Sequence, residues 1–133
     1  MSSSKGHNIL IVDDSATTRA YIRRAIALSG VTAGNVYEAA NGQEALEVMS
    51  RQDVDVLLAD LQMPQMDGGQ MVRHMFEDPK LRDVVVIVIS ADPNKAAVES
   101  VLRTGARGYL PKPFTPEAFR RELVRALEEV ARV

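Results

Sequence analysis

Residues 54–68 read VDVLLADLQMPQMDG, and this stretch decides how the rest of the chain is interpreted. An apolar run with one acid inside it ends on Asp60. A loop containing Pro64 follows, and Asp67-Gly68 then begins a helix. This pattern is typical of a buried strand that delivers Asp60 to the carboxyl edge of a sheet. In open α/β sheets ligands bind outside that edge, so polar residues at the ends of other strands bear on function.

Four further segments have the length and composition of strands. The runs at 8–12 and 84–89 are continuously apolar, which is typical of strands that are covered on both faces. Shorter strands are predicted at 36–39 and 107–110, and the segment 54–60 makes the third of five in chain order.

In the segments between these strands, apolar residues occur at helical spacing. Asp14 or Ser15 is expected to cap the first helix, and Asp67 the third. The fourth helix is expected to open at Asp92, with Pro93 in its first turn. The predicted helices cover residues 15–29, 44–49, 68–76, 92–104 and the chain from 115 onward.

Alternating strands and helices indicate an α/β fold with a parallel sheet and helices on both of its faces. All strands of such a sheet end at the same edge. The residues at or just past those ends are Asp13, Asp14, Asp60, Ser90 and Lys112.

These five side chains suit one kind of chemistry. Two carboxylates about 4 Å apart repel by roughly 4 kcal/mol at an effective dielectric constant near 20, so three of them either raise a pKa or recruit a cation. Oxygen ligands without His or Cys suit Mg²⁺. A carboxylate nucleophile beside a hard cation, an ammonium group and a hydroxyl is the equipment of phosphoryl transfer. Taken singly, each side chain has an ordinary interpretation as a cap, a turn residue or a solvated lysine.

Composition narrows the class of protein. The 133 residues fit one domain. A formal net charge of -2 argues against a nucleic-acid-binding surface, which needs clustered Lys and Arg. The absence of cysteine excludes disulfides and thiolate metal sites, and no apolar run has the length of a membrane span. A cytoplasmic protein is expected.

Five different short motifs are spread over nearly the whole chain. They are Ile11-Val12-Asp13-Asp14-Ser15, Asp60-Leu61-Gln62-Met63-Pro64 with Asp67-Gly68, Ile89-Ser90-Ala91, Gly105-Ala106 followed by Tyr109, and Lys112-Pro113-Phe114. In this combination the chain resembles the receiver domain of two-component response regulators, and most closely the stand-alone, CheY-like receivers of chemotaxis. The resemblance implies a flavodoxin-like, doubly wound five-stranded parallel sheet of order 2-1-3-4-5 with five helices. Residues 8–133 would form the receiver domain and residues 1–7 a disordered tail.

The resemblance also implies a role for each site residue. Asp60 would be phosphorylated by a histidine kinase or a histidine phosphotransfer protein. Asp14 and Asp60 would bind Mg²⁺ directly, together with the backbone carbonyl of Gln62, and Asp13 would act mainly through water. Lys112 would pair with a phosphoryl oxygen.

Further residues would transmit and time the signal. Ser90 would move toward the phosphoryl group and Tyr109 would turn inward behind it. Lys112-Pro113 would be a cis peptide. Gln62 and Asp92 occupy the positions that tune hydrolysis of the acyl phosphate in the family. The output face would be formed by the fourth helix, the fifth strand and the fifth helix, where a downstream protein binds. The resemblance leaves open a monomer or a phosphorylation-dependent dimer, and a stand-alone receiver, weakly favoured by the methionine start, or part of a longer regulator.

Two other functions share parts of this pattern. An aspartyl-phosphate phosphohydrolase also uses Asp, Lys and Ser or Thr. Its nucleophile stands in an Asp-x-Asp pattern, however, and this chain has Gln62 in place of the second Asp. A flavodoxin-like electron carrier would need a hydroxyl- and glycine-rich phosphate loop after the first strand, where this chain has two acids. The chain has no G-x-G-x-x-G, which argues against a dinucleotide site. A phosphorylatable signalling switch is the preferred hypothesis.

Overall fold

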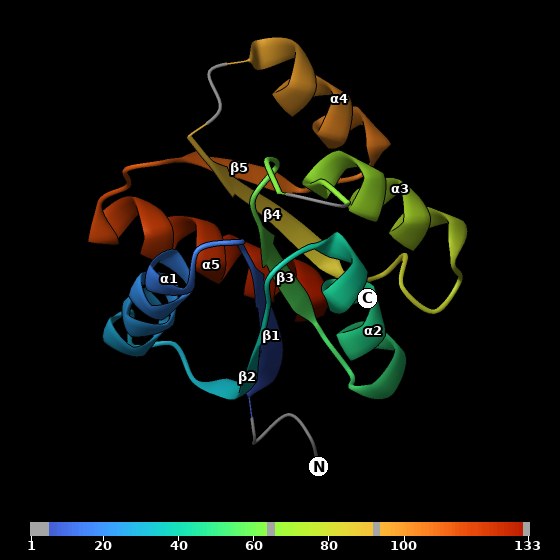
Figure 1. Ribbon diagram of the computed structural model, residues 1–133. Coiled ribbons are helices and arrows are strands. Elements are labelled where there is room, and N and C mark those ends of the chain that lie inside the picture. The colour runs from blue at the N-terminus through green and yellow to red at the C-terminus, as the bar shows by residue number, and fades with distance from the viewer. Residues whose placement is uncertain (1–5, 64–65, 92–93, 132–133) are drawn as a thin grey trace.

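The computed structural model describes residues 6–63, 66–91 and 94–131 (Figure 1). Within them, five strands alternate with five helices, as the sequence predicts. The elements are β1 (His7–Val12), α1 (Ala16–Leu28), β2 (Ala33–Ala39), α2 (Gly42–Arg51), β3 (Val56–Ala59), α3 (Gly68–Glu77), β4 (Val85–Ser90), α4 (Lys95–Thr104), β5 (Gly108–Pro111) and α5 (Pro116–Ala131).

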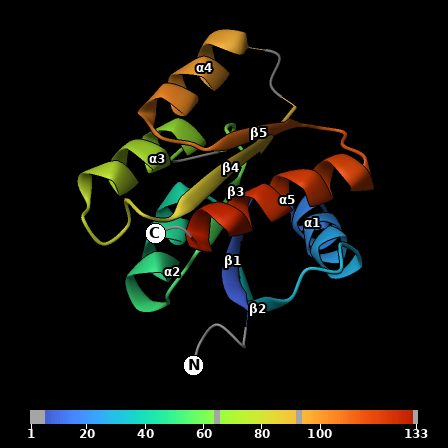
Figure 2. The same ribbon diagram turned by 180° about the vertical axis from the view of Figure 1, so that it is seen from behind.

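The strands form one parallel sheet of order β2-β1-β3-β4-β5. Helices α1 and α5 cover one face, and α2, α3 and α4 cover the other (Figures 1 and 2). The predicted doubly wound architecture is therefore confirmed. Since β1 and β3 are neighbours, with Val12 opposite Ala59, the residues that follow them emerge side by side.

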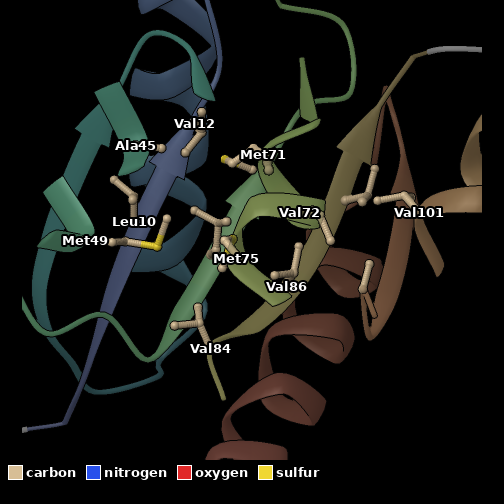
Figure 3. Close-up of a cluster of buried hydrophobic side chains, with 14 of the residues drawn as sticks. Leu10, Val12, Ala45, Met49, Met71, Val72, Met75, Val84, Val86 and Val101 are labelled. Carbon is tan, nitrogen blue, oxygen red and sulfur yellow. The ribbon is translucent and has the colours of Figure 1, made fainter. Parts of the chain in front are cut away.

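Two hydrophobic clusters hold the layers together. Under α2, α3 and α4, Leu10 and Val12 of β1 pack with side chains such as Met49, Met71 and Met75 (Figure 3). Ile9 and Ile11 point to the opposite face. Consecutive positions of β1 are apolar because each face of the sheet needs alternate residues. Each fully buried aliphatic side chain contributes about 1.5–3 kcal/mol.

The second cluster lies under α1 and α5. Ile22 and Ile26 of α1 meet Phe119 and Leu123 of α5 over the sheet. The ring of Phe119 stacks on Phe114, with 5.3 Å between centroids. The cluster fixes α5 against the strands and so positions the loop between β5 and α5.

Side-chain caps begin α1 and α3 as predicted. Ser15 accepts a hydrogen bond from the Thr18 N–H at the start of α1. Asp67 and Gln70 form a capping box at α3. The prediction for α4 is wrong: the helix begins at Lys95 with Asn94 as its N-cap, not at Asp92.

Asn94 takes the cap position because its side-chain oxygen accepts hydrogen bonds from two backbone N–H groups, those of Ala96 and Ala97. Asp92 and Pro93 lie outside the described residues.

At the other end of the chain, β1 begins at His7, the last residue of the predicted tail. His7 pairs with Ala33 of β2, so this residue belongs to the sheet, and residues 1–5 lie outside the described part. No helix within the described ranges has the length and apolar character needed to cross a membrane.

Candidate functional site

Three carboxylates meet where β1 and β3 end. Asp13 and Asp14 follow β1, and Asp60 follows β3. The Asp60 N–H donates to the Val12 carbonyl over 3.0 Å, which continues the ladder one residue past the strands. Each of the three side chains offers an oxygen, and these oxygens lie within 4.8 Å of one another. Asp13 is 2% exposed and Asp60 9%, whereas Asp14 is exposed.

Lys112 faces this cluster from the loop after β5. Its Nζ donates to Asp13 Oδ2 at 2.8 Å and to Asp60 Oδ2 at 3.2 Å. Its backbone N–H donates to the Ser90 carbonyl at 3.0 Å, which ties the loop to the end of β4. The predicted cis peptide between Lys112 and Pro113 is present.

Charges around Lys112 keep it protonated. Burial alone would lower the pKa of Lys112, but the hydrogen bond to Asp13 and the charges of Asp60 and Asp13 outweigh it and raise the pKa above the usual 10.5. The ammonium group is therefore charged throughout the neutral range.

Ser90 and Tyr109 lie next to each other beyond the carboxylates. Ser90 ends β4 and is 0% exposed. The half-buried Tyr109 donates its hydroxyl to the Ser90 carbonyl at 3.4 Å, in register with the β4–β5 pairing of Val88 with Tyr109. The structure thus brings together the two residues for which the resemblance implies a switch.

Gln62 contacts Asp60, the candidate phosphoryl acceptor, through its backbone. Its N–H donates to Asp60 Oδ1 at 3.2 Å, while its side chain is exposed. The side-chain amide of Gln62 is therefore open to solvent. Asp92, the other predicted timing residue, lies outside the described residues.

The donor set fits a hard divalent cation. Three carboxylates face a single ammonium group, so a charge of about -2 stays uncompensated by their contacts with Lys112. In the described part of the chain, Asp14 makes no recorded hydrogen bond or ion pair that would compete with a metal. Oxygen ligands with an open outer side are what Mg²⁺ uses, since it keeps several waters.

Behind Asp13 lies a group of residues that the sequence analysis missed. The Nη1 of Arg19 donates to the Asp13 carbonyl at 2.6 Å, and its Nε donates to Glu38 Oε1 at 2.9 Å. Arg23 donates from its Nε to the other oxygen of Glu38 at 2.8 Å. The only signal in the sequence is the spacing of the two arginines, four residues apart and so on one helix face.

Glu38 makes the stability of this region pH-dependent. Burial alone would raise the pKa of Glu38, but the hydrogen bonds and charges of Arg23 and Arg19 lower it below 4.5. Because the pKa of Glu38 is lower in the folded protein, its negative charge stabilises the fold at pH values above the pKa of the unfolded chain. This contribution is lost as the pH falls through the pKa of the folded state.

We therefore expect Glu38→Gln to cost about 1 kcal/mol at neutral pH, the scale of one or two solvent-accessible ion pairs. The difference from the wild type should shrink as the pH falls below about 4.5. Urea unfolding along a pH series measures it. A penalty that stays constant into acid would show that charge is not its cause.

The sequence of the chain matches a known protein family. The family model of the response regulator receiver domain matches residues 9–124. The chain belongs to the response regulator receiver family. A CheY homologue of chemotaxis from Campylobacter jejuni is 34% identical over 116 residues, which cover 86% of this chain and 88% of the relative.

Solved receiver structures agree with the fold. The receiver domain of AraT, a response regulator from Geobacillus stearothermophilus, has a TM-score of 0.84 at 34% identity and covers 95% of this chain and 96% of its own. The receiver domain of the sensor histidine kinase PA1611 from Pseudomonas aeruginosa has a TM-score of 0.80 at 28% identity, covering 92% and 98%. That structure is described with a magnesium ion coordinated in its active-site cleft. Receivers are signalling domains of phosphorelays rather than conventional enzymes.

Proposed function

We propose that this receiver is a phosphorylation switch in which Asp60 accepts a phosphoryl group from a phosphohistidine in a Mg²⁺-dependent reaction. The observation that supports the proposal most is the contact of one ammonium group, Lys112 Nζ, with both Asp13 and Asp60. The charge pattern is that of a site built for an anion and a cation together.

The proposed step is an in-line displacement at phosphorus. A carboxylate oxygen of Asp60 forms a new P–O bond, and the P–N bond of the donor phosphohistidine breaks. The imidazole leaves with the electron pair of that bond and regains a proton from solvent. The product is an acyl phosphate on Asp60. The chain thus promotes its own phosphorylation and later its own dephosphorylation, and acts on no other substrate.

The neighbouring residues prepare Asp60 for this step. Asp13 and Asp60 hold the ammonium of Lys112 where it can pair with a phosphoryl oxygen. Asp14, Asp60 and the backbone carbonyl of Gln62 would hold Mg²⁺, with Asp13 reaching it through water. When bound, this ion supplies positive charge that offsets the charge of the phosphoryl oxygens.

The buried Ser90 lies on the strand beside Asp60 and would donate its hydroxyl to the phosphoryl group. Tyr109 would follow it, which changes the output face of α4, β5 and α5. In that surface β5 is the edge strand of the sheet, and Leu102 of α4 is 37% exposed. Gln62 would orient a water for hydrolysis of the acyl phosphate, with Asp92 as the second timing residue.

The partners follow from the family. The phosphoryl donor would be a sensor histidine kinase or a histidine phosphotransfer protein, and a downstream protein would bind the output face. A cytoplasmic location, and a monomer or phosphorylation-dependent dimer, stay predictions.

Incubation with acetyl phosphate tests the proposal. Intact-mass spectrometry of the wild type should detect a single phosphoryl adduct when Mg²⁺ is present and none when a chelator removes it. Absence of an adduct, together with absence of phosphate release, would contradict the proposal. Steady phosphate release without an adduct would indicate fast turnover or a hydrolase, and trapping with a beryllium fluoride mimic of the phosphoryl group separates the two.

A further inference from the structure

Among the described residues, Asp13 makes four hydrogen bonds, two through its backbone and two through its carboxylate. Its N–H donates to the Ala39 carbonyl at 3.1 Å, and its Oδ1 accepts from the Ser15 N–H at 2.9 Å. Its Oδ2 accepts from Lys112 at 2.8 Å. Its backbone carbonyl accepts from Arg19 at 2.6 Å. Of these, the Arg19 contact alone holds the peptide that joins Asp13 to Asp14.

That peptide decides where the Asp14 carboxylate points. Asp14 is exposed and has no recorded hydrogen bond or ion pair among the described residues. Nothing on its own side chain fixes it, so its direction follows from the backbone on either side. On the outer side the Ser15 cap fixes the backbone, and on the inner side Arg19 does.

Arg19 is itself fixed from β2. Its side chain is 17% exposed, and its Nε lies 2.9 Å from Glu38 Oε1. The guanidinium group is a rigid fork of donors, so one edge bound to Glu38 sets the direction of the Nη1 that reaches Asp13. Arg23 holds the second oxygen of Glu38 at 2.8 Å but makes no recorded contact with Asp13.

We propose that Arg19 is a positioning residue for the cation site, which holds the Asp13-Asp14 peptide so that the two carboxylates converge with Asp60. Glu38 serves as its anchor on β2. The inference rests on the proposed function, because it assumes that Mg²⁺ binds these carboxylates. Residues that orient metal ligands in this way typically change metal affinity 10- to 100-fold when they are replaced.

The sign of the effect separates positioning from simple electrostatics. Removing a cation close to three carboxylates would strengthen Mg²⁺ binding if only charge mattered. Loss of positioning weakens it. Arg19→Met should therefore raise the dissociation constant for Mg²⁺ about tenfold, against the direction that charge alone gives.

Arg23→Met is the matched control, since it breaks an ion pair with the same Glu38 from the same helix face and leaves Asp13 untouched. It should leave the Mg²⁺ affinity within about twofold of the wild type. Arg19→Lys keeps the charge but cannot bridge Glu38 and Asp13 as a fork, so it should also weaken binding. This variant keeps the test decisive if Arg19→Met folds poorly.

Calorimetric titration of each folded variant with Mg²⁺ gives the affinities. Hydrogen exchange of the Ser15 amide adds a metal-free measurement, since that amide donates to Asp13 and should exchange faster in Arg19→Met than in Arg23→Met. Unchanged or tighter Mg²⁺ binding in both Arg19 variants, or equal losses in Arg23→Met, would overturn the inference and leave the proposed function intact. A wild type that binds no Mg²⁺ would overturn both.

Discussion

Replacing Lys112 with methionine is expected to slow phosphorylation of Asp60 about 10²- to 10³-fold, the usual cost of losing one charged or hydrogen-bonding group aimed at a transition state. Methionine fills a similar volume without the ammonium group. The initial rate of adduct formation from acetyl phosphate at saturating Mg²⁺ measures the effect. Lys80→Met, which removes an exposed lysine, is the control and should react like the wild type. A normal rate in Lys112→Met would contradict a role for Lys112 in phosphoryl transfer.

The same substitution should also destabilise the fold. It leaves Asp13 and Asp60, both nearly buried, without their cation, and breaking such a pair costs about 3 kcal/mol or more. Mg²⁺ binds the folded state, so it should raise the Tm of the variant more than that of the wild type.

The penalty has a defined pH range. Because the pKa of Lys112 is raised above 10.5, its contribution to stability is complete below about pH 10.5 and is lost as the pH rises through the folded value. Denaturant unfolding at neutral and alkaline pH should therefore show the gap between wild type and Lys112→Met closing. A gap that persists at strongly alkaline pH would mean that packing rather than charge is responsible.

Gly68→Ala should have the second largest effect, on the fold and the site together. A Cβ on Gly68 would lie 2.4 Å from the carbonyl oxygen of Asp60 and 3.0 Å from the Cα of Leu61. These are backbone atoms, so they cannot turn aside, and the start of α3 must move away from the residue that follows β3. Overpacking of this kind costs about 1–3 kcal/mol, which exceeds the gain of about 1 kcal/mol from alanine in a helix.

Gly69→Ala is the matched control one residue along. Its nearest neighbour would be Asp67 Oδ1 at 3.4 Å, an ordinary contact. Here the helix propensity of alanine should prevail and stabilise the protein by up to about 1 kcal/mol. Urea unfolding of the two variants should give changes of opposite sign, and only Gly68→Ala should impair adduct formation. Equal changes would contradict the proposed close approach of α3 to Asp60.

The strands and the main site residues could be predicted because their signals are local. Continuous apolar runs mark strands that are covered on both faces, and each such run stops where the chain reaches the site. Asp13, Asp60 and Lys112 could be assigned to one edge on that basis. Their contact required the neighbouring positions of β1 and β3, which follow from the family resemblance and not from periodicity.

The misses arise where local signals compete or where contacts are distant in sequence. Asp92-Pro93 and Asn94 are both good helix starts, and spacing cannot rank them. The structure selects Asn94, whose oxygen accepts two backbone hydrogen bonds. Arg19 was missed because its partner Glu38 lies 19 residues away, and no pattern within a helix reveals a contact with another strand.

The identity of the phosphorylated residue tests the central claim most directly. After reaction with acetyl phosphate and Mg²⁺, intact-mass spectrometry should find the adduct in Ser90→Ala and in Asp53→Asn, an exposed acid just before β3, but not in Asp60→Asn. Hydroxylamine should remove it, since it cleaves acyl phosphates and leaves serine phosphates. An adduct that persists in Asp60→Asn, or that survives hydroxylamine, would contradict the assignment of Asp60 as the phosphoryl acceptor.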